Sequence, residues 1–149
     1  PRFNLPNYVS SRQLSFIEVG KAGASTININ RLRPSFRSFL VNAPQALDHS
    51  LFRPYITEMT SFEYIPFAIE ILAIEILLIL LLLFPTKKRI VDPLIYFCIF
   101  FSITSFLVIG YTVPIVGAIV RYRSIYLIFL LLPILGYLNW NQLKNFKFK

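Results

Sequence analysis

Three long apolar stretches dominate the second half of the chain. The first runs from about residue 62 to residue 84 and contains nine consecutive apolar residues, 76–84. At about 1.5 Å per residue, a helix of this length covers about 30–35 Å, the thickness of one hydrocarbon core. Pro85 and the basic residues 87–89 follow it. The pattern predicts a membrane-spanning helix with a basic collar.

The second apolar stretch is longer than one bilayer requires. It carries no charged residue from position 93 to position 120, and a helix of these 28 residues would be about 42 Å long. We therefore expect a helix over residues 93–109, followed by a bent or re-entrant connection over residues 110–120. The break is expected at the residues that weaken a helix, Gly110, Pro114 and Gly117.

A third apolar stretch, residues 124–138, predicts the last span, with Pro133 expected to bend it. The motif Arg121-Tyr122-Arg123 comes directly before this stretch. The pattern therefore places the motif in a turn at the membrane boundary, beside the glycine-containing connection.

The N-terminal region, residues 1–61, is too polar to span a bilayer. Residues 1–24 contain two prolines and two glycines and are expected to be irregular, whereas residues 25–33 alternate like a short strand. Residues 36–51 repeat apolar side chains at helical spacing, with a break expected at Pro44. This helix either lies on the membrane surface or packs onto a domain outside the chain, and the sequence favours neither.

These elements together predict an all-α membrane protein with about three transmembrane helices, preceded by an amphipathic, membrane-surface N-terminal region. The expected parts are an extracytoplasmic irregular and amphipathic region (1–61), a three-helix transmembrane region (62–140) and a basic cytoplasmic tail (141–149). The orientation follows from the positive-inside bias, because basic residues 87–89 separate the first two spans and three lysines occupy the tail. The N-terminal region and the Arg-Tyr-Arg motif then share the outer face.

Composition argues against several classes of function. Hydrophobic residues make up 56% of the chain and charged residues 15%, and the net charge is +8. The basic residues lie in the first 53 positions and in the collars of the spans, which favours anionic lipids over nucleic acid as partners. With a single Cys98 and a single His49, we expect no disulfide, metal site or cofactor. The P-loop and GxSxG motifs of soluble enzymes are absent from the sequence.

Two arginines at the membrane boundary are the first candidates for a functional site. Arg121 and Arg123 run against the positive-inside bias, so either they serve a function or carboxylates hold them in place. Together with Arg53 they would clamp a phosphate or diphosphate head group through bidentate hydrogen bonds. The alternative is that they snorkel to the interface and simply end a helix.

Two glutamates in the first span are the second candidates. Glu75 lies near the middle of the hydrocarbon, where a carboxylate costs about 2.5–3.5 kcal/mol on insertion scales. Glu70 lies about 140° round the helix from it, so the two do not form an acid-base pair. Spans two and three carry no Lys or Arg at membrane depth, so we expect the hydrogen-bond partner to come from a helix outside this chain. A proton or ion relay is the alternative.

Asp48, His49 and Arg53 lie within six positions at the end of the predicted amphipathic helix. A catalytic Asp-His pair would need both side chains on one substrate, but adjacent helical residues point about 100° apart. We therefore interpret these three residues as part of a polar face toward water.

The order of these features resembles a known family. The segments AGASTININ and NAPQALDHSLFRPY, the glutamate-containing first span and residues 117–123 are similar to the C-terminal portion of a poorly characterised family of polytopic inner-membrane proteins of Gram-negative bacteria. Members often look associated with cell-surface polysaccharide assembly. The resemblance covers roughly residues 20–135. It implies a multi-pass inner-membrane protein, with further spans before Pro1.

Three functions are compatible with the sequence. The first is a subunit, or the C-terminal part of a larger polytopic protein, that serves assembly of a cell-envelope membrane complex; its partners would be other membrane subunits or missing N-terminal spans. The second is a lipid-linked glycan enzyme or transporter that binds a diphosphate through Arg121, Arg123 and Arg53. The third is an ion-coupled component that uses Glu70 and Glu75. The sequence leaves open whether the protein is an enzyme.

Overall fold

The computed structural model describes residues 4–21, 26–55, 62, 65–86 and 92–145. Within these ranges the chain forms six α-helices and no β-strand. Three of the helices are long and apolar enough to cross a membrane. The predicted all-α membrane fold with three spanning helices is confirmed.

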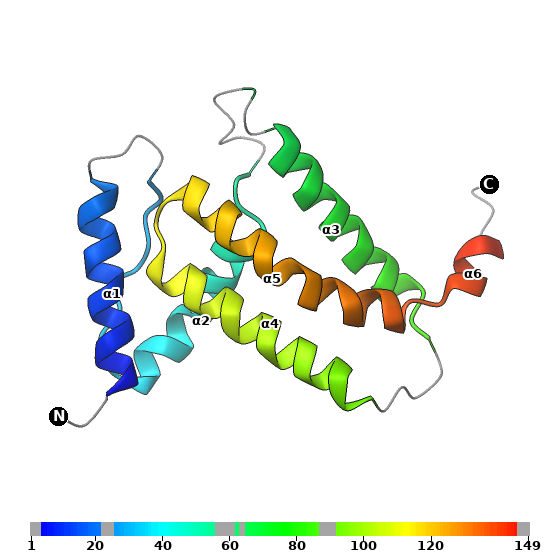
Figure 1. The fold of residues 1–149 in the computed structure, drawn as a ribbon, viewed down its shortest axis with the longest axis horizontal. Helices are drawn as coiled ribbons and strands as arrows, with labels where there is room; N and C mark the ends of the chain where they lie inside the picture. Colours follow the sequence, from blue (N-terminus) through cyan, green and yellow to red (C-terminus); the bar gives the residue numbers. More distant parts are fainter. Residues whose placement is uncertain (1–3, 22–25, 56–61, 63–64, 87–91, 146–149) are drawn as a thin grey trace.

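The three spanning helices are α3 (Ile65–Leu83), α4 (Pro93–Thr112) and α5 (Val116–Tyr137). Figure 1 shows α5 between the other two, and both of them pack against it. α4 runs antiparallel to α5, whereas α3 and α5 run in the same direction. The starts of α3 and α5 and the end of α4 therefore lie at one end of the bundle, where the N-terminal helices also lie.

Backbone hydrogen bonds join the ends of α3 and α5 at the opposite end of the bundle. The N–H of Thr86 donates to the carbonyl of Tyr137 at 2.7 Å, and the N–H of Asn139 donates to the carbonyl of Phe84 at 2.8 Å. The short helix α6 (Trp140–Asn145) follows directly. These bonds hold the carboxyl ends of the two parallel spans side by side.

The connection between α4 and α5 is much shorter than the sequence predicts. α4 continues to Thr112 and α5 begins at Val116, so only residues 113–115 lie between them. Pro114 alone accounts for the interruption, since it has no N–H to donate and restricts the residue before it. The predicted bent connection over residues 110–120 is therefore wrong, and the Arg-Tyr-Arg motif lies inside α5 rather than in a turn.

The first helix, α1 (Leu5–Gly20), occupies a segment that the sequence analysis predicts to be irregular. Its start follows known rules: Asn4 is the N-cap, its side chain accepts the N–H of Asn7 at 3.4 Å, and Pro6 sits in the first turn, where its missing N–H costs nothing. Pro6 and Gly20 lie at the two ends of this helix, so they do not indicate the absence of one.

Helix α2 (Phe36–Leu51) is the amphipathic helix that the sequence predicts. Ser35 caps its start by accepting the N–H of Ser38 at 3.4 Å. The break predicted at Pro44 is wrong, because the helix runs through this proline. The carbonyl that Pro44 leaves without an intrahelical donor belongs to Leu40, an exposed residue, so no buried acceptor is lost.

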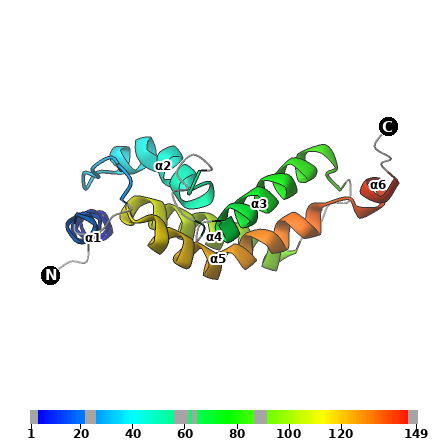
Figure 2. The same ribbon diagram turned by 90° about the horizontal axis from the view of Figure 1, so that it is seen from above.

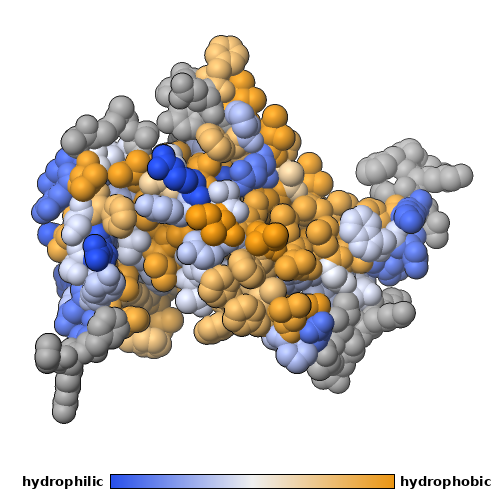
Figure 3. Space-filling view, viewed as in Figure 1, coloured by the Kyte–Doolittle hydropathy of each residue, from blue (hydrophilic) through white to orange (hydrophobic). Residues whose placement is uncertain are grey.

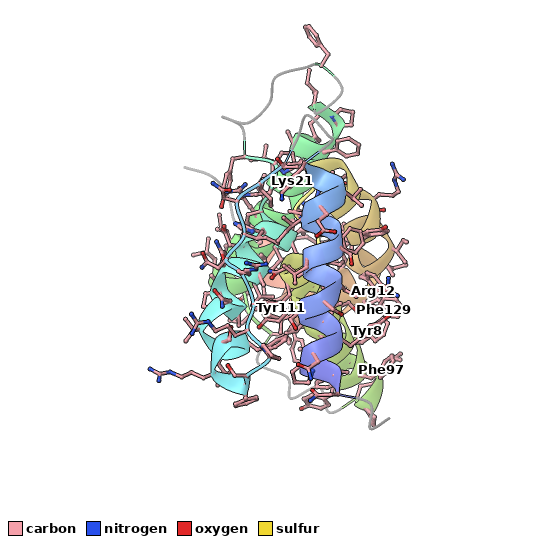
Figure 4. The ribbon with its side chains drawn as sticks, turned by 90° about the vertical axis from the view of Figure 1, so that its left-hand side faces the viewer. Tyr8, Arg12, Lys21, Phe97, Tyr111 and Phe129 are labelled. Carbon is pink, nitrogen blue, oxygen red and sulfur yellow. The ribbon has the colours of Figure 1, made fainter. Side chains whose placement is uncertain are left out.

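A buried glutamine fastens α1 to the rest of the protein. Gln13 is 1% exposed, and its side-chain amide donates to the carbonyls of Asn30 and Tyr111, both at 2.9 Å. Its side-chain oxygen accepts the N–H of Leu32 at 2.8 Å. Three separate segments therefore meet at one side chain, and Figure 4 shows Tyr111 between α1 and α2.

The segment predicted as a short strand is extended but unpaired over most of its length. Thr26 forms an isolated bridge with Ile115, and the N–H of Ile27 donates to the carbonyl of Pro114 at 2.8 Å. The alternating pattern reflects a segment that lies across the turn between α4 and α5, where no neighbouring strand is described. The strand prediction is wrong.

Helix α2 lies across the last turns of α4, as the view in Figure 2 shows. The crossing is close because Gly110 of α4 meets the backbone of Ala46, with no room for a Cβ between them. The Tyr111 hydroxyl donates to the carbonyl of Phe39 at 2.7 Å. α2 thus packs within this chain, and its membrane-surface location stays a prediction. Its outward-facing apolar side chains are Phe36, Leu40 and Val41.

Hydrophobic side chains cover much of the surface of the three spans. Figure 3 shows this surface over α3, α4 and α5, with hydrophilic residues gathered near α1 and near α6. α3 is the least enclosed span: 11% of its apolar window is buried, against 33% for α4. α4 packs against α1, α2 and α5, whereas α3 packs mainly against α5 and less extensively.

Candidate functional site

A group of ionisable side chains lies where the end of α2 meets α3 and α5. We call Asp48, Arg53, Tyr55, Glu70 and Arg123 the junction cluster. They come from α2, from the segment after it and from two of the three spans. Figure 2 shows the end of α2 near α5, and the segment after α2 lines a cavity with α3.

Arg123 is the centre of the junction cluster. Its side chain is fully buried, and Nη1 donates to the carbonyls of Arg53 at 2.8 Å and Leu51 at 3.3 Å. The last carbonyls of a helix have no intrahelical donors, and Leu51 is the last residue of α2. Arg123 therefore caps the C-terminus of α2, where a positive charge also complements the helix dipole.

The same guanidinium pairs with Glu70 of α3. The Nε of Arg123 lies 3.4 Å from Oε1 of Glu70, whose side chain is 27% exposed. An arginine stays charged in proteins, so this burial is tolerable only with a carboxylate close by. The pair joins α3 to α5 at the end of the bundle where α2 also ends.

The expectation that both glutamates lack a partner in this chain is wrong for Glu70. It rests on placing Arg123 in a turn outside the third span. Because α5 begins at Val116, Arg123 lies in its second turn and beside α3. The sequence left two explanations for these arginines, a function or a carboxylate that holds them in place. For Arg123 the structure supports the carboxylate, Glu70.

Arg121 and Arg123 do not face a common ligand in this structure. Two positions apart on a helix corresponds to about 200° of rotation, so the two side chains leave opposite sides of α5. Arg121 is exposed, whereas Arg123 is enclosed by protein. The guanidinium predicted to hold a diphosphate therefore binds two carbonyls and a carboxylate instead.

Arg53 lies over a tyrosine ring at the edge of the cluster. Its Cζ atom is 5.1 Å from the centre of the Tyr55 ring, within the range of a cation–π contact. The Tyr55 hydroxyl donates to Oδ2 of Asp48 at 2.5 Å. Burial, followed by this hydrogen bond and the charge of Asp48, raises the pKa of Tyr55. The only signal for Tyr55 in the sequence is its position directly after Arg53-Pro54.

The interpretation of Asp48, His49 and Arg53 as a polar face toward water is wrong for His49. This side chain is 3% exposed, because it lies on the side of α2 that packs into the protein. Asp48 and Arg53 are half-buried. Asp48 accepts the hydrogen bond of the Tyr55 hydroxyl.

Glu75 has surroundings unlike those of Glu70. It lines a cavity of about 140 Å³ between α3 and the segment after α2, together with Phe52, Pro54, Tyr55, Ala68, Ile71 and Leu72. Among the residues that the structure describes, Glu75 forms no hydrogen bond and no ion pair. It is the one carboxylate of the spans that the described part of this chain leaves without a partner.

The described residues contain no group of three or more His, Cys, Asp or Glu side chains arranged to hold a metal ion. Comparison with known proteins finds no match: no family model fits the chain, and neither a curated protein nor a solved structure matches it. Function must therefore be inferred from the geometry of the junction cluster and the Glu75 cavity.

Proposed function

We propose that this chain is an integral inner-membrane subunit, or the C-terminal part of a larger polytopic protein, that serves assembly of a cell-envelope membrane complex. The observation that supports this proposal most strongly is Glu75. It lies on the least enclosed span, half-way along the helix, and has no partner among the described residues. A carboxylate at that depth costs about 2.5–3.5 kcal/mol on insertion scales, and a neighbouring helix offsets this cost by supplying a donor.

The packing of the chain agrees with a structural role. The arginine that would serve diphosphate binding is committed to α2 and α3, and it holds three elements together. Glu70 is committed to the same contact, which removes one of the two carboxylates that an ion relay would use. The remaining group, Glu75, is half-buried in the cavity between α3 and the segment after α2, next to the exposed Leu72.

Site-specific photo-crosslinking tests this proposal in native membranes. A photoreactive residue in place of Leu72, which is 51% exposed beside the Glu75 cavity, should give a discrete protein adduct. The matched control is Ile128 of α5, which is 59% exposed on a surface with no carboxylate near it in sequence, and it should give mainly lipid adducts. Lipid adducts alone at Leu72 would refute the proposed function.

A further inference from the structure

The charges around the Glu75 cavity do not balance. Counted as formal charges with neutral histidine, Asp48, Glu70 and Glu75 contribute −3 and Arg53 and Arg123 contribute +2, a formal net charge of −1. Glu70 lies beside Arg123. Asp48 and Arg53 both contact Tyr55, one at its hydroxyl and the other at its ring. The uncompensated charge therefore belongs to Glu75.

The missing positive charge cannot come from the neighbouring stretches of this sequence. No Lys, Arg or His occurs between Arg53 and Lys87, and α4 contains no charged residue. α5 carries two cations: Arg123 is already bound, and Arg121 leaves the opposite side of the helix. A balancing cation near Glu75 has to be supplied from outside the described bundle.

The cavity has the shape and lining for an extended cationic side chain. Positions 68, 71, 72 and 75 form one face of α3, and they lie opposite Phe52, Pro54 and Tyr55. Aliphatic and aromatic walls suit the methylene groups of Lys or Arg. Glu75 and the exposed Leu72 lie on the open side, so a neighbouring helix can reach the cavity.

We infer that the cavity beside Glu75 binds a lysine or arginine side chain from a neighbouring transmembrane helix. The inference rests on the proposed function and specifies its partner: a span with one cation at the depth of Glu75. Insertion of that side chain neutralises the net charge of −1 and removes two unpaired charges from the membrane at once. The helix that carries this side chain also covers Leu72, which this chain leaves 51% exposed.

Substitutions at Glu75 test whether the side chain that the partner inserts into the cavity is positively charged. The readout is the yield of the protein adduct formed from the photoreactive residue at position 72, in native membranes. Glu75→Asp should keep most of the yield, because it keeps the charge. Glu75→Gln should lower apparent association about tenfold, the effect of losing one interhelical polar contact. Glu75→Lys should lower it further, because like charges then face each other.

The outcomes separate the inference from the proposed function. If Glu75→Gln and Glu75→Lys give the wild-type yield, a partner covers α3 without using its charge, and the cation is ruled out while the proposed function stands. If the wild-type chain gives no protein adduct, the proposed function is refuted, and the inference that rests on it is refuted as well. Thermal unfolding of each variant in detergent should match the wild type, because no described contact of Glu75 is lost.

A chemical probe tests the same inference without any substitution. Dicyclohexylcarbodiimide reacts with protonated carboxyl groups in apolar surroundings and not with carboxylates held by a cation. In native membranes Glu75 should resist this reagent as well as Glu70 does, since Arg123 holds Glu70. Rapid labelling of Glu75 alone would show that a proton, and not a partner's cation, neutralises it, and would overturn the inference.

Discussion

Helix α2 packs closely against α4, whereas the segment after α2 packs loosely against α3. In the contact with α4, the backbone of Ala46 touches Gly110, and the Tyr111 hydroxyl donates a hydrogen bond to the carbonyl of Phe39. Toward α3, the segment after α2 leaves a cavity of about 140 Å³ and a glutamate with no partner among the described residues. The first region is closely packed within this chain, whereas we propose that a partner completes the second.

The difference indicates where stability and function reside. Substitutions at the α2–α4 crossing should change the stability of the isolated chain, whereas substitutions in the Glu75 cavity should change association and little else. Arg123 connects the two regions, because it caps α2 and also holds α3.

The largest effect is expected from breaking the connection itself. Arg123→Leu leaves Glu70 without its cation and two carbonyls without a donor, and the free energy of unfolding should fall by about 3–5 kcal/mol. The double variant Glu70→Leu/Arg123→Leu should recover part of this loss, since no unpaired charge remains. Thermal unfolding in detergent, followed by circular dichroism, measures both, and a double variant no more stable than Arg123→Leu would contradict the ion pair.

The next effect concerns the closely packed crossing. A Cβ on Gly110 would overlap the carbonyl of Ala46, so Gly110→Ala should force α2 away from α4 and cost about 3 kcal/mol. Gly117→Ala is the matched control: it lies in a helix with no atom within 4 Å of the added Cβ, and it should stabilise the chain by up to about 1 kcal/mol. Equal unfolding temperatures for the two variants would be incompatible with this crossing.

A smaller effect is expected where α1 is fastened. Gln13→Ala removes three hydrogen bonds and leaves buried backbone groups unpaired, which should cost about 1–3 kcal/mol. Hydrogen exchange should accelerate in α1 and around Leu32, with α3 unchanged. The exposed neighbour Ser11→Ala serves as the control. Faster exchange throughout the bundle would show that α1 is not a separately fastened element.

The smallest effect lies at the edge of the cavity. Because the folded protein holds the pKa of Tyr55 above its ordinary value, the unfolded state loses this proton first as the pH rises. The contribution of Tyr55 to stability should therefore be complete below pH 10 and be lost as the pH rises through the pKa of the folded state. Tyr55→Phe should remove this alkaline component, and unfolding scans between about pH 8 and 11 measure it. An unchanged alkaline profile would contradict the bond to Asp48.

The spans were predictable from their continuous apolar residues, because both the lipid and the protein core favour apolar side chains. Helix α2 was predictable from apolar residues at helical spacing, because one of its faces packs against the protein. Apolar periodicity could not predict α1, whose apolar residues gather on one helical face much less than those of α2, and which a buried glutamine fastens to the rest of the protein. Pro44 shows the same limit. Whether a proline breaks a helix depends on where the carbonyl four residues earlier lies, and only the tertiary structure places it.

The candidate site was predictable in its residues but not in its pairings. Glu70, Glu75, Arg123 and Arg53 were all selected from the sequence. The decisive fact was the start of α5, since a shift of eight positions, from 124 to 116, moved Arg123 from an exposed turn into the bundle. No local signal determines that boundary once Pro114 and Gly117 both suggest a break.

The most direct test of the account is the pair of crosslinking yields at Leu72, measured in native membranes with Glu75 and with Glu75→Lys. The account predicts a discrete protein adduct with Glu75 that is lowered more than about tenfold by Glu75→Lys, while thermal unfolding in detergent is unchanged. A Leu72 position that labels only lipid, or an adduct with the same yield in both chains, would contradict the claim that α3 is covered by a partner bound through the charge of Glu75.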